Sequence, residues 1–236
     1  MEKIPILADY QNPMVQKVAL ELTQTESDIV GKVRRIFEFV RDEIKFGFSP
    51  DGDWVSASKT LQIKIGQCNT KSTLFLALCK ALNIPARIHF SLIKREIQHG
   101  VFPEFLYLLL PKQLSHSWIE INIDNKWLRI DGYIDDLVYF RGAIDQLTKS
   151  GWDIGFAIAC DEEKLSPEFN PNEEKFEQMC AVTEDHGIWN DPIEYYQSNL
   201  YRNRPNFLKQ FIYRLFIPLV NHRIEKIRQI SKRAGT

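Results

Sequence analysis

Three residues that lie far apart in the sequence have the types and the order that nucleophilic catalysis requires. Cys68 begins an apolar run in Gly66-Gln67-Cys68-Asn69, and His116 and then Asp131 follow. A thiol can act as a nucleophile, an imidazole as its base, and a carboxylate as the group that orients the imidazole. The three positions do not form one local motif. The prediction therefore depends on a fold that brings them together.

The element that carries Cys68 is predicted to be a central helix. Residues 68–82 are apolar on nearly every side, which is typical of a buried helix. Unpaired backbone N–H groups at a helix start lower the pKa of a thiol there, and a neighbouring imidazole lowers it further. The same N–H groups can stabilise an oxyanion. The alternative is a structural cysteine in the core; we favour the catalytic role.

His116 and Asp131 are predicted to share one face of a β-hairpin. Residues 115–123 and 126–131 alternate in polarity on either side of a turn at Asp124-Asn125. This register pairs apolar with apolar and acidic with basic residues. The expected pairs are Trp118 with Asp131, Ile119 with Ile130, and Glu120 with Arg129. His116 then lies diagonally across from Asp131, and a slip of one residue would separate them.

The remaining pattern predicts an α+β fold. Helices are expected first, then an antiparallel sheet, then helices again. The expected helices are residues 12–24, 25–46, 56–65, 172–182, 191–202 and 206–231, and the further strands are residues 86–93 and 105–110. We divide the chain into a core at residues 1–135 and a helical C-terminal extension at residues 136–236, packed on the core.

Composition is ordinary for a soluble globular protein. The 236 residues are 44% hydrophobic and 26% charged, with a net charge of -1, which does not favour nucleic acid as a partner. The local charge is uneven: residues 157–195 are acidic and residues 201–236 are basic. We favour two solvated faces over a basic tail that contacts a membrane or an acidic partner. The apolar stripe of residues 207–219 is expected to pack on the body of the protein.

Cysteine spacing predicts neither a disulfide framework nor a zinc site. Cys68, Cys79, Cys160 and Cys180 include no closely spaced pair. Residues 1–10 contain no apolar signal core, and residues 215–220 are too short an apolar run to cross a bilayer. We expect a reducing, cytoplasmic setting, and no metal or organic cofactor.

Four segments in the correct order resemble the transglutaminase-like superfamily. They are Gly66-x-Cys68 before a helix, Asn83-Ile84-Pro85-Ala86-Arg87, His116-x-Trp118-x-Glu120, and Trp127-x-x-x-Asp131. The segments 39–46 and 56–61 also look like that family's core. The resemblance covers roughly residues 10–132 and leaves residues 133–236 unexplained.

The resemblance implies a papain-like fold and a catalytic triad. Cys68 would be the nucleophile, His116 the general base and acid, and Asp131 the orienting group. Family members cleave, deamidate or cross-link amide bonds through a thioester, so a protein or peptide substrate is expected. The family often has Pro after the triad Asp, where this chain has Gly132. An upstream Trp serves the oxyanion in the eukaryotic cross-linking enzymes.

The resemblance leaves the reaction open. Trp54, Gln67 and Trp118 are the further candidates for substrate binding or oxyanion stabilisation, although Trp118 also fits a core or pocket wall. We favour hydrolysis, by a peptidase, amidase or deamidase, since the chain is short and lacks the extra domains of the large cross-linking enzymes. The alternatives are a protein-glutamine cross-linking transferase and a non-catalytic binding module with the same fold.

Overall fold

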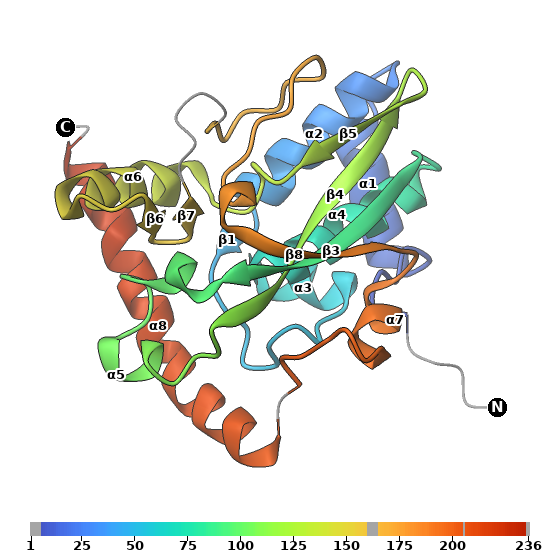
Figure 1. The fold of residues 1–236 in the computed structure, drawn as a ribbon. Helices are drawn as coiled ribbons and strands as arrows, with labels where there is room; N and C mark the ends of the chain where they lie inside the picture. The colour runs from blue at the N-terminus through green and yellow to red at the C-terminus, as the bar shows by residue number, and fades with distance from the viewer. Residues whose placement is uncertain (1–5, 160–164, 205, 235–236) are drawn as a thin grey trace.

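The protein is an α+β molecule built around a four-stranded antiparallel sheet, as a computed structural model shows (Figure 1). The structure describes residues 6–159, 165–204 and 206–234. The sheet has the order β5-β4-β3-β8. Its strands are β3 (Ala86–Lys94), β4 (Gln113–Ile123), β5 (Lys126–Ile130) and β8 (Val182–Trp189). Shorter strands are β1 (Lys45–Phe46), β2 (Ile65–Gly66), β6 (Ile154–Gly155) and β7 (Ile158–Ala159).

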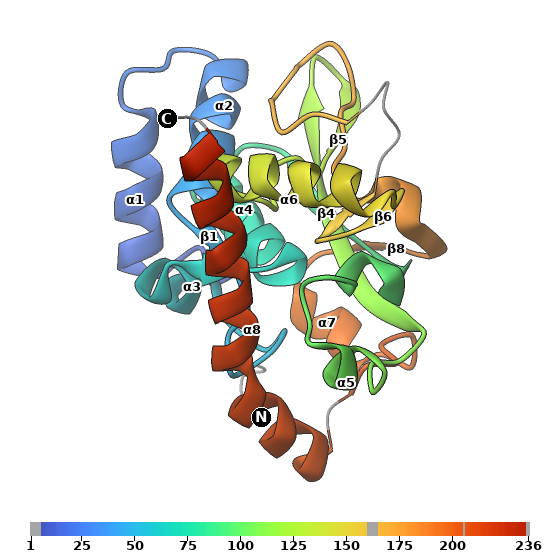
Figure 2. The same ribbon diagram turned by 90° about the vertical axis from the view of Figure 1, so that its left-hand side faces the viewer.

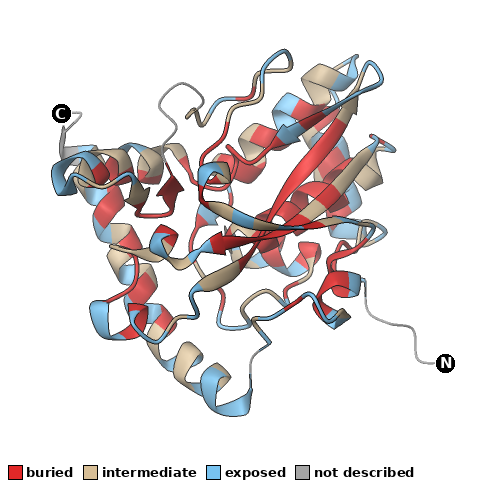
Figure 3. Cartoon of the chain, in the orientation of Figure 1, coloured by how far each residue is buried: buried red, intermediate tan, exposed pale blue. Residues whose placement is uncertain are grey.

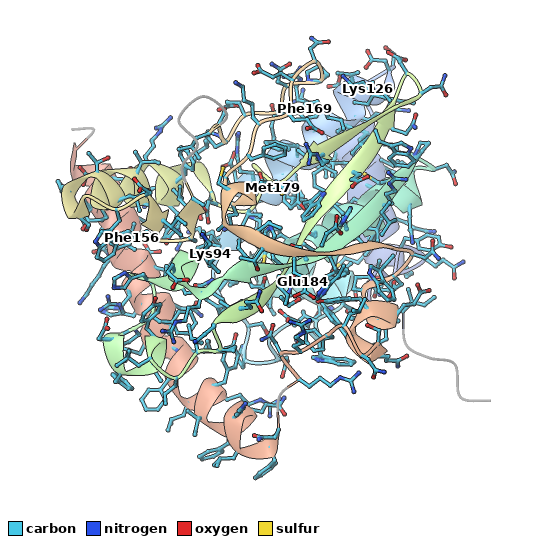
Figure 4. The ribbon with its side chains drawn as sticks, in the orientation of Figure 1. Lys94, Lys126, Phe156, Phe169, Met179 and Glu184 are labelled. Carbon is cyan, nitrogen blue, oxygen red and sulfur yellow. The ribbon has the colours of Figure 1, made fainter. Side chains whose placement is uncertain are left out.

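Helices cover one face of this sheet and continue beyond it (Figures 1 and 2). The α-helices are α1 (Pro13–Thr23), α2 (Ile29–Asp42), α3 (Ala57–Ile63), α4 (Cys68–Ala81), α5 (Glu104–Tyr107), α6 (Leu137–Ser150), α7 (Pro192–Gln197) and α8 (Phe207–Ala234). Two 3-10 helices are η1 (Arg95–Gln98) and η2 (Met179–Ala181), and Met179 is labelled in Figure 4. Both the predicted fold class and the helical character of the C-terminal extension are confirmed.

Helix α4 is the buried centre of the molecule, as predicted. Its side chains from Asn69 to Cys79 are all buried, and Figure 3 shows the helix and the adjoining part of β4 in the buried colour. A capping box fixes its start: the Gln67 side chain accepts the backbone N–H of Asn69, and Thr70 accepts that of Gln67. Asn83, with φ 55°, ends it in a left-handed conformation. The cap places Cys68 at the first helical residue.

The predicted hairpin register is confirmed. β4 pairs with β5 through Ile119–Ile130, Glu120–Arg129 and Ile121–Leu128, around a turn in which Asp124 and Asn125 have positive φ. The pairing stops at Ile130. Asp131 therefore lies just beyond the ladder, and among the described residues no strand pairs on that side with the part of β4 before Ile119.

Two predicted elements are wrong. Residues 105–110 are not a strand, because the chain forms the short helix α5 there, begun by Pro103. Residues 172–182 are not a helix; they form a loop, then η2 and the first residue of β8. The backbone N–H groups of Glu177 and Gln178 in this loop bind the buried carboxylate of Asp131. A tertiary contact thus replaces the helical hydrogen bonds there.

The predicted helix at residues 25–46 is also shorter than expected. Asp28 caps α2 and accepts the backbone N–H of Gly31, and the helix ends at Asp42. Residues 45–46 form β1, which pairs in parallel with β2. This pairing brings the chain before Cys68 beside the end of α2.

The C-terminal half of the chain adds both a strand and a helix to the body. β8 pairs with β3, and α8 packs on α6; the second half of α8 buries the side chains of Ile217, Val220, Ile224 and Ile227. In contrast, the first half of α8 exposes its apolar stripe, including Phe207, Leu208, Phe211, Leu215 and Leu219. The expectation that this stripe packs on the body is wrong for these residues. The choice of solvated charged faces over a tail that contacts a membrane or an acidic partner stays a prediction. Within the described residues, none of the helices combines the length and apolarity that crossing a bilayer needs.

Candidate active site

Cys68 lies where the start of α4 meets the free edge of β4. The thiol is half-buried and donates a hydrogen bond to the side-chain carbonyl of Gln67, at 3.1 Å between Sγ and Oε1. The backbone N–H of Ser117 approaches the sulfur, and that of Asn69 lies near it while bonded to the Gln67 side chain. N–H donors near a sulfur favour its thiolate form.

The edge of β4 at this point is held by side chains in place of a strand. The odd-numbered residues of β4 direct their backbone groups toward the β5 side, and β5 ends opposite Ile119. Beyond that point Ser72 donates to the carbonyl of Ser117 at 3.2 Å, and Asn69 to that of Ser115 at 3.4 Å. The start of α4 is therefore fastened to the strand that carries His116.

The pKa of the Cys68 thiol is raised, against the prediction. Burial is the largest cause, and the carboxylate of Asp53 raises it further, whereas the N–H groups of Ser117 and Asn69 lower it only in part. Removal of the sulfur from water outweighs the field of the helix start. Cys68 is therefore a neutral thiol in this conformation.

His116 is fully buried, and among the described residues neither ring nitrogen has a hydrogen-bond partner. Burial lowers the pKa of its imidazole to about 3. The ring lies 6.1 Å from that of Trp118, as expected for neighbours on one strand face. His116 is thus a neutral imidazole, placed in the chain directly before the Ser117 N–H that faces the Cys68 sulfur.

Asp131 is also fully buried, but its carboxylate is bound elsewhere. Its oxygens accept the backbone N–H groups of Glu177 at 2.8 Å and Gln178 at 2.9 Å. Burial nevertheless raises the pKa of Asp131 to about 7. The Tyr133 hydroxyl, bonded to Ser72, lies close enough to both Cys68 and Asp131 for their charges to raise its pKa.

The structure therefore places the three predicted residues around one region without linking them. In the part of the chain that it describes, His116 is hydrogen-bonded to neither Cys68 nor Asp131. The predicted triad roles stay a prediction.

The three further candidates for substrate binding or oxyanion stabilisation lie in different parts of the structure. Gln67 lies beside the thiol, and its amide nitrogen donates to Asp53 at 2.6 Å. Trp54 is 39% exposed and packs on Tyr196 and Tyr201, above a pocket of about 420 Å³. Trp118 is buried and stacks on His89, on the sheet face opposite to Ile119. Trp118 thus packs on one face of the sheet, and none of the described contacts joins it to the Cys68 thiol.

Three residues at the site carried no signal in the sequence. Asp53 links Gln67 to the hydroxyl of Tyr201, which donates to it at 3.0 Å. Asn203 bonds the β4 edge beside Cys68, at Ser115. The sequence analysis singled out none of the three, and Tyr201 and Asn203 lie outside residues 10–132, which carry the family resemblance.

Buried carboxylates gather behind Asp131. Asp135 and Glu177 are fully buried, and burial raises the pKa of each well above its usual range. The Lys71 ammonium nearby donates to the backbone carbonyls of Arg41 and Ile134. Within the described ranges, no three His, Cys, Asp or Glu side chains are arranged to hold a metal ion.

Comparison with known proteins identifies a family for about half of the chain. The sequence model of the transglutaminase-like superfamily matches residues 16–132. No protein with a curated description matches the sequence.

Two solved structures resemble part of the chain. One is a candidate cysteine protease from Cytophaga hutchinsonii, with 21% identity over 55% of this chain and 39% of that protein, and a TM-score of 0.42. The other is a candidate protease from Parabacteroides distasonis, with 14% identity over 53% of this chain and 24% of that protein, and a TM-score of 0.39. The chain spans less than half the length of either protein.

Proposed function

Residues 16–132 belong to the transglutaminase-like superfamily, and from this premise we propose that the protein is a cysteine hydrolase that cleaves amide bonds of proteins or peptides. The observation that carries the proposal is the position of Cys68. Its sulfur lies at the first residue of a buried helix, and the backbone N–H groups of Asn69 and Ser117 lie near it. Such N–H groups favour the thiolate form, which is the form that attacks a carbonyl.

The proposed reaction begins when the Cys68 sulfur attacks the carbonyl carbon and His116 accepts the thiol proton. The tetrahedral intermediate collapses as the C–N bond breaks, and His116 gives its proton to the leaving amine. The product is a thioester on Cys68. Water, deprotonated by His116, attacks the thioester; the C–S bond breaks, and the thiol and a carboxylic acid are released.

This reaction requires a rearrangement of the described conformation. The His116 imidazole has to turn toward the free edge of β4, and Asp131 has to accept the imidazole N–H in addition to the backbone N–H groups that it binds. On this proposal, the neutral state of the Cys68 thiol and of the buried His116 imidazole is a resting form.

The same observations support a second candidate function. A raised thiol pKa and an unpartnered imidazole are also what a non-catalytic binding module with this fold would have. Such a module would bind a polypeptide at the site without forming a thioester.

Turnover of a peptide and amide library tests the proposal. The wild type, Cys68→Ala and Cys180→Ala would be incubated with the library, with and without a fluorescent primary amine. We expect hydrolysis by the wild type and by Cys180→Ala, whose side chain is exposed, and none by Cys68→Ala. Incorporation of the amine in place of hydrolysis would assign a transferase. Equal turnover in Cys68→Ala would rule out both enzymes.

A further inference from the structure

The side chain of Asn203 occupies a backbone-pairing position on the free edge of β4. Its carbonyl oxygen accepts the backbone N–H of Ser115 at 2.5 Å, and its amide nitrogen donates to the backbone carbonyl of Gln113 at 3.2 Å. These are the two bonds that one residue of a parallel neighbouring strand would make, with its N–H donating to Gln113 and its C=O accepting from Ser115. The Asn203 carboxamide thus takes the place of the N–H and C=O of one main-chain residue.

The occupied position lies in line with the nucleophile. Gln113, Ser115 and Ser117 direct their backbone groups to the same edge, and the N–H of Ser117 faces the Cys68 sulfur. Alternate residues of a strand are roughly 7 Å apart. A chain that paired with Gln113 and Ser115 would therefore reach the thiol within about two residues of its own length.

The segment that carries Asn203 is also fastened on the other side of Cys68. The buried Tyr201 hydroxyl donates to Asp53, and Asp53 accepts a hydrogen bond from the amide of Gln67, the residue before the nucleophile. Residues 201–203 thus span the entrance to the site from the β4 edge to the start of α4. The charge of Asp53 adds to the raised pKa of the Cys68 thiol.

We propose that the β4 edge from Gln113 to Ser117 is a docking site for the main chain of an extended polypeptide, and that Asn203 holds this site in the unliganded protein. A main-chain donor and acceptor, spaced as in a strand, fit any extended polypeptide by strand addition. This inference rests on the proposed function for its substrate, but the docking itself does not require turnover.

Binding to a chain that cannot react tests the docking separately from catalysis. The probe is fluorescein-labelled, carboxymethylated casein, an unfolded polypeptide, titrated by fluorescence anisotropy against Cys68→Ala. In the double variant Cys68→Ala/Asn203→Ala we expect the Kd to fall about tenfold, since the competing side chain is gone. Arg204→Ala on the same background is the matched control, because the hydrogen bonds of Arg204 to described residues go to the carbonyls of Gln197 and Ser198 and leave the β4 edge untouched. It should leave the Kd unchanged.

Two further measurements keep the test decisive. Asn203→Asp keeps the shape and the acceptor for Ser115 but loses the donor to Gln113, so it should lower the Kd by a smaller factor even where Asn203→Ala is poorly folded. Casein binding should also slow amide hydrogen exchange at residues 113–117.

Several results would overturn the docking site. They are an unchanged Kd in both Asn203 variants, no casein binding by any variant, or casein binding that leaves exchange at residues 113–117 unchanged. An equal gain for acetylglutamine amide would instead assign the position to a single primary amide. Loss of turnover in the wild type, with these binding results intact, would contradict the proposed hydrolase and leave the docking site standing.

Discussion

At the scale of single residues, burial determines the charge state of the candidate site. Cys68 and His116 are both neutral in the folded protein because removal from water disfavours their charged forms. The thiol and the imidazole that would exchange a proton in the proposed reaction are thus both uncharged in this conformation. Movement of water or substrate into the site would favour the thiolate and imidazolium.

The pH dependence of stability should report the burial of His116. The unfolded chain protonates this residue below about pH 6.5, whereas the folded imidazole stays neutral down to about pH 3. Its contribution to stability is therefore present above about pH 6.5 and is lost as the pH falls toward about 3. Between about pH 6.5 and about pH 4.5 the wild type should lose about 2 kcal/mol of unfolding free energy more than His116→Gln.

Urea unfolding of both proteins across this pH range measures the difference. Parallel curves for the wild type and His116→Gln would show that the imidazole titrates normally in the folded state.

The charge of Asp53 should slow the reaction of Cys68 with an alkylating reagent. Asp53→Asn removes a charge that raises the pKa of the Cys68 thiol, so the thiolate fraction at neutral pH should rise. We expect about a tenfold faster reaction with iodoacetamide, which corresponds to one pKa unit. Asp51→Asn is the control, since Asp51 is exposed and pairs with Arg214. An unchanged rate in Asp53→Asn would show that burial alone suppresses the thiol.

The candidate residues were only partly predictable from sequence. The position of Cys68 could be predicted because Gly66, the polar cap and the apolar run after it mark a helix start. The partners of Asp131 were not, because backbone N–H groups of a distant loop leave no trace in side-chain pattern. The shift in the pKa of the Cys68 thiol was predicted in the wrong direction, since burial at a helix start depends on which later segments of the chain cover it.

At the scale of elements, the sequence pattern correctly predicted the helices and strands whose apolar residues recur with the period of a buried helix or strand face. The β4–β5 register followed from alternation and the Asp124-Asn125 turn, and α4 from its continuous apolar run. The helix predicted at residues 172–182 was wrong because backbone groups of this segment bond to the Asp131 carboxylate and to the sheet. They therefore do not bond to one another as they would in a helix. Their structure is determined by tertiary contacts, which composition does not encode.

Close packing of α6 on α8 should depend on Gly142. A Cβ at this position would lie 2.3 Å from the backbone carbonyl oxygen of Ile227, so one helix would have to shift. Gly142→Ala should lower the unfolding free energy by about 1–3 kcal/mol, measured by chemical denaturation.

Gly31→Ala in α2 is the matched control. Its Cβ would meet only the end of the flexible Glu26 side chain, and Ala favours a helix over Gly. It should be neutral or stabilising by up to about 1 kcal/mol. An equal loss in both variants would contradict the packing argument.

At the scale of the whole molecule, the buried guanidinium of Arg228 joins the C-terminal half to the core. The Arg228 guanidinium bonds the Asp136 carboxylate at 2.6 Å and the backbone carbonyl of Phe46. Both side chains are about 6% exposed, so removal of one partner leaves a charge without solvent. The predicted division at residues 135 and 136 stays a prediction, and the hydrogen bond from Arg228 to Phe46 and the β3–β8 ladder cross it.

Arg228→Leu should therefore destabilise the protein by about 3–5 kcal/mol in chemical denaturation. Arg214→Leu is the matched control, because its pair with Asp51 is half-exposed and should contribute only about 0–1 kcal/mol. Similar small losses in both variants would mean that α8 is not anchored through Arg228.

Covalent capture of the nucleophile tests the central claim most directly. A peptidyl vinyl sulfone would be incubated with the wild type and with His116→Gln, both shown to be folded, and the adducts mapped by mass spectrometry. We expect the wild-type adduct on Cys68 rather than on the exposed Cys180, and its near absence in His116→Gln. Equal modification of the two cysteines, or an adduct on Cys68 that forms as fast without His116, would contradict the account.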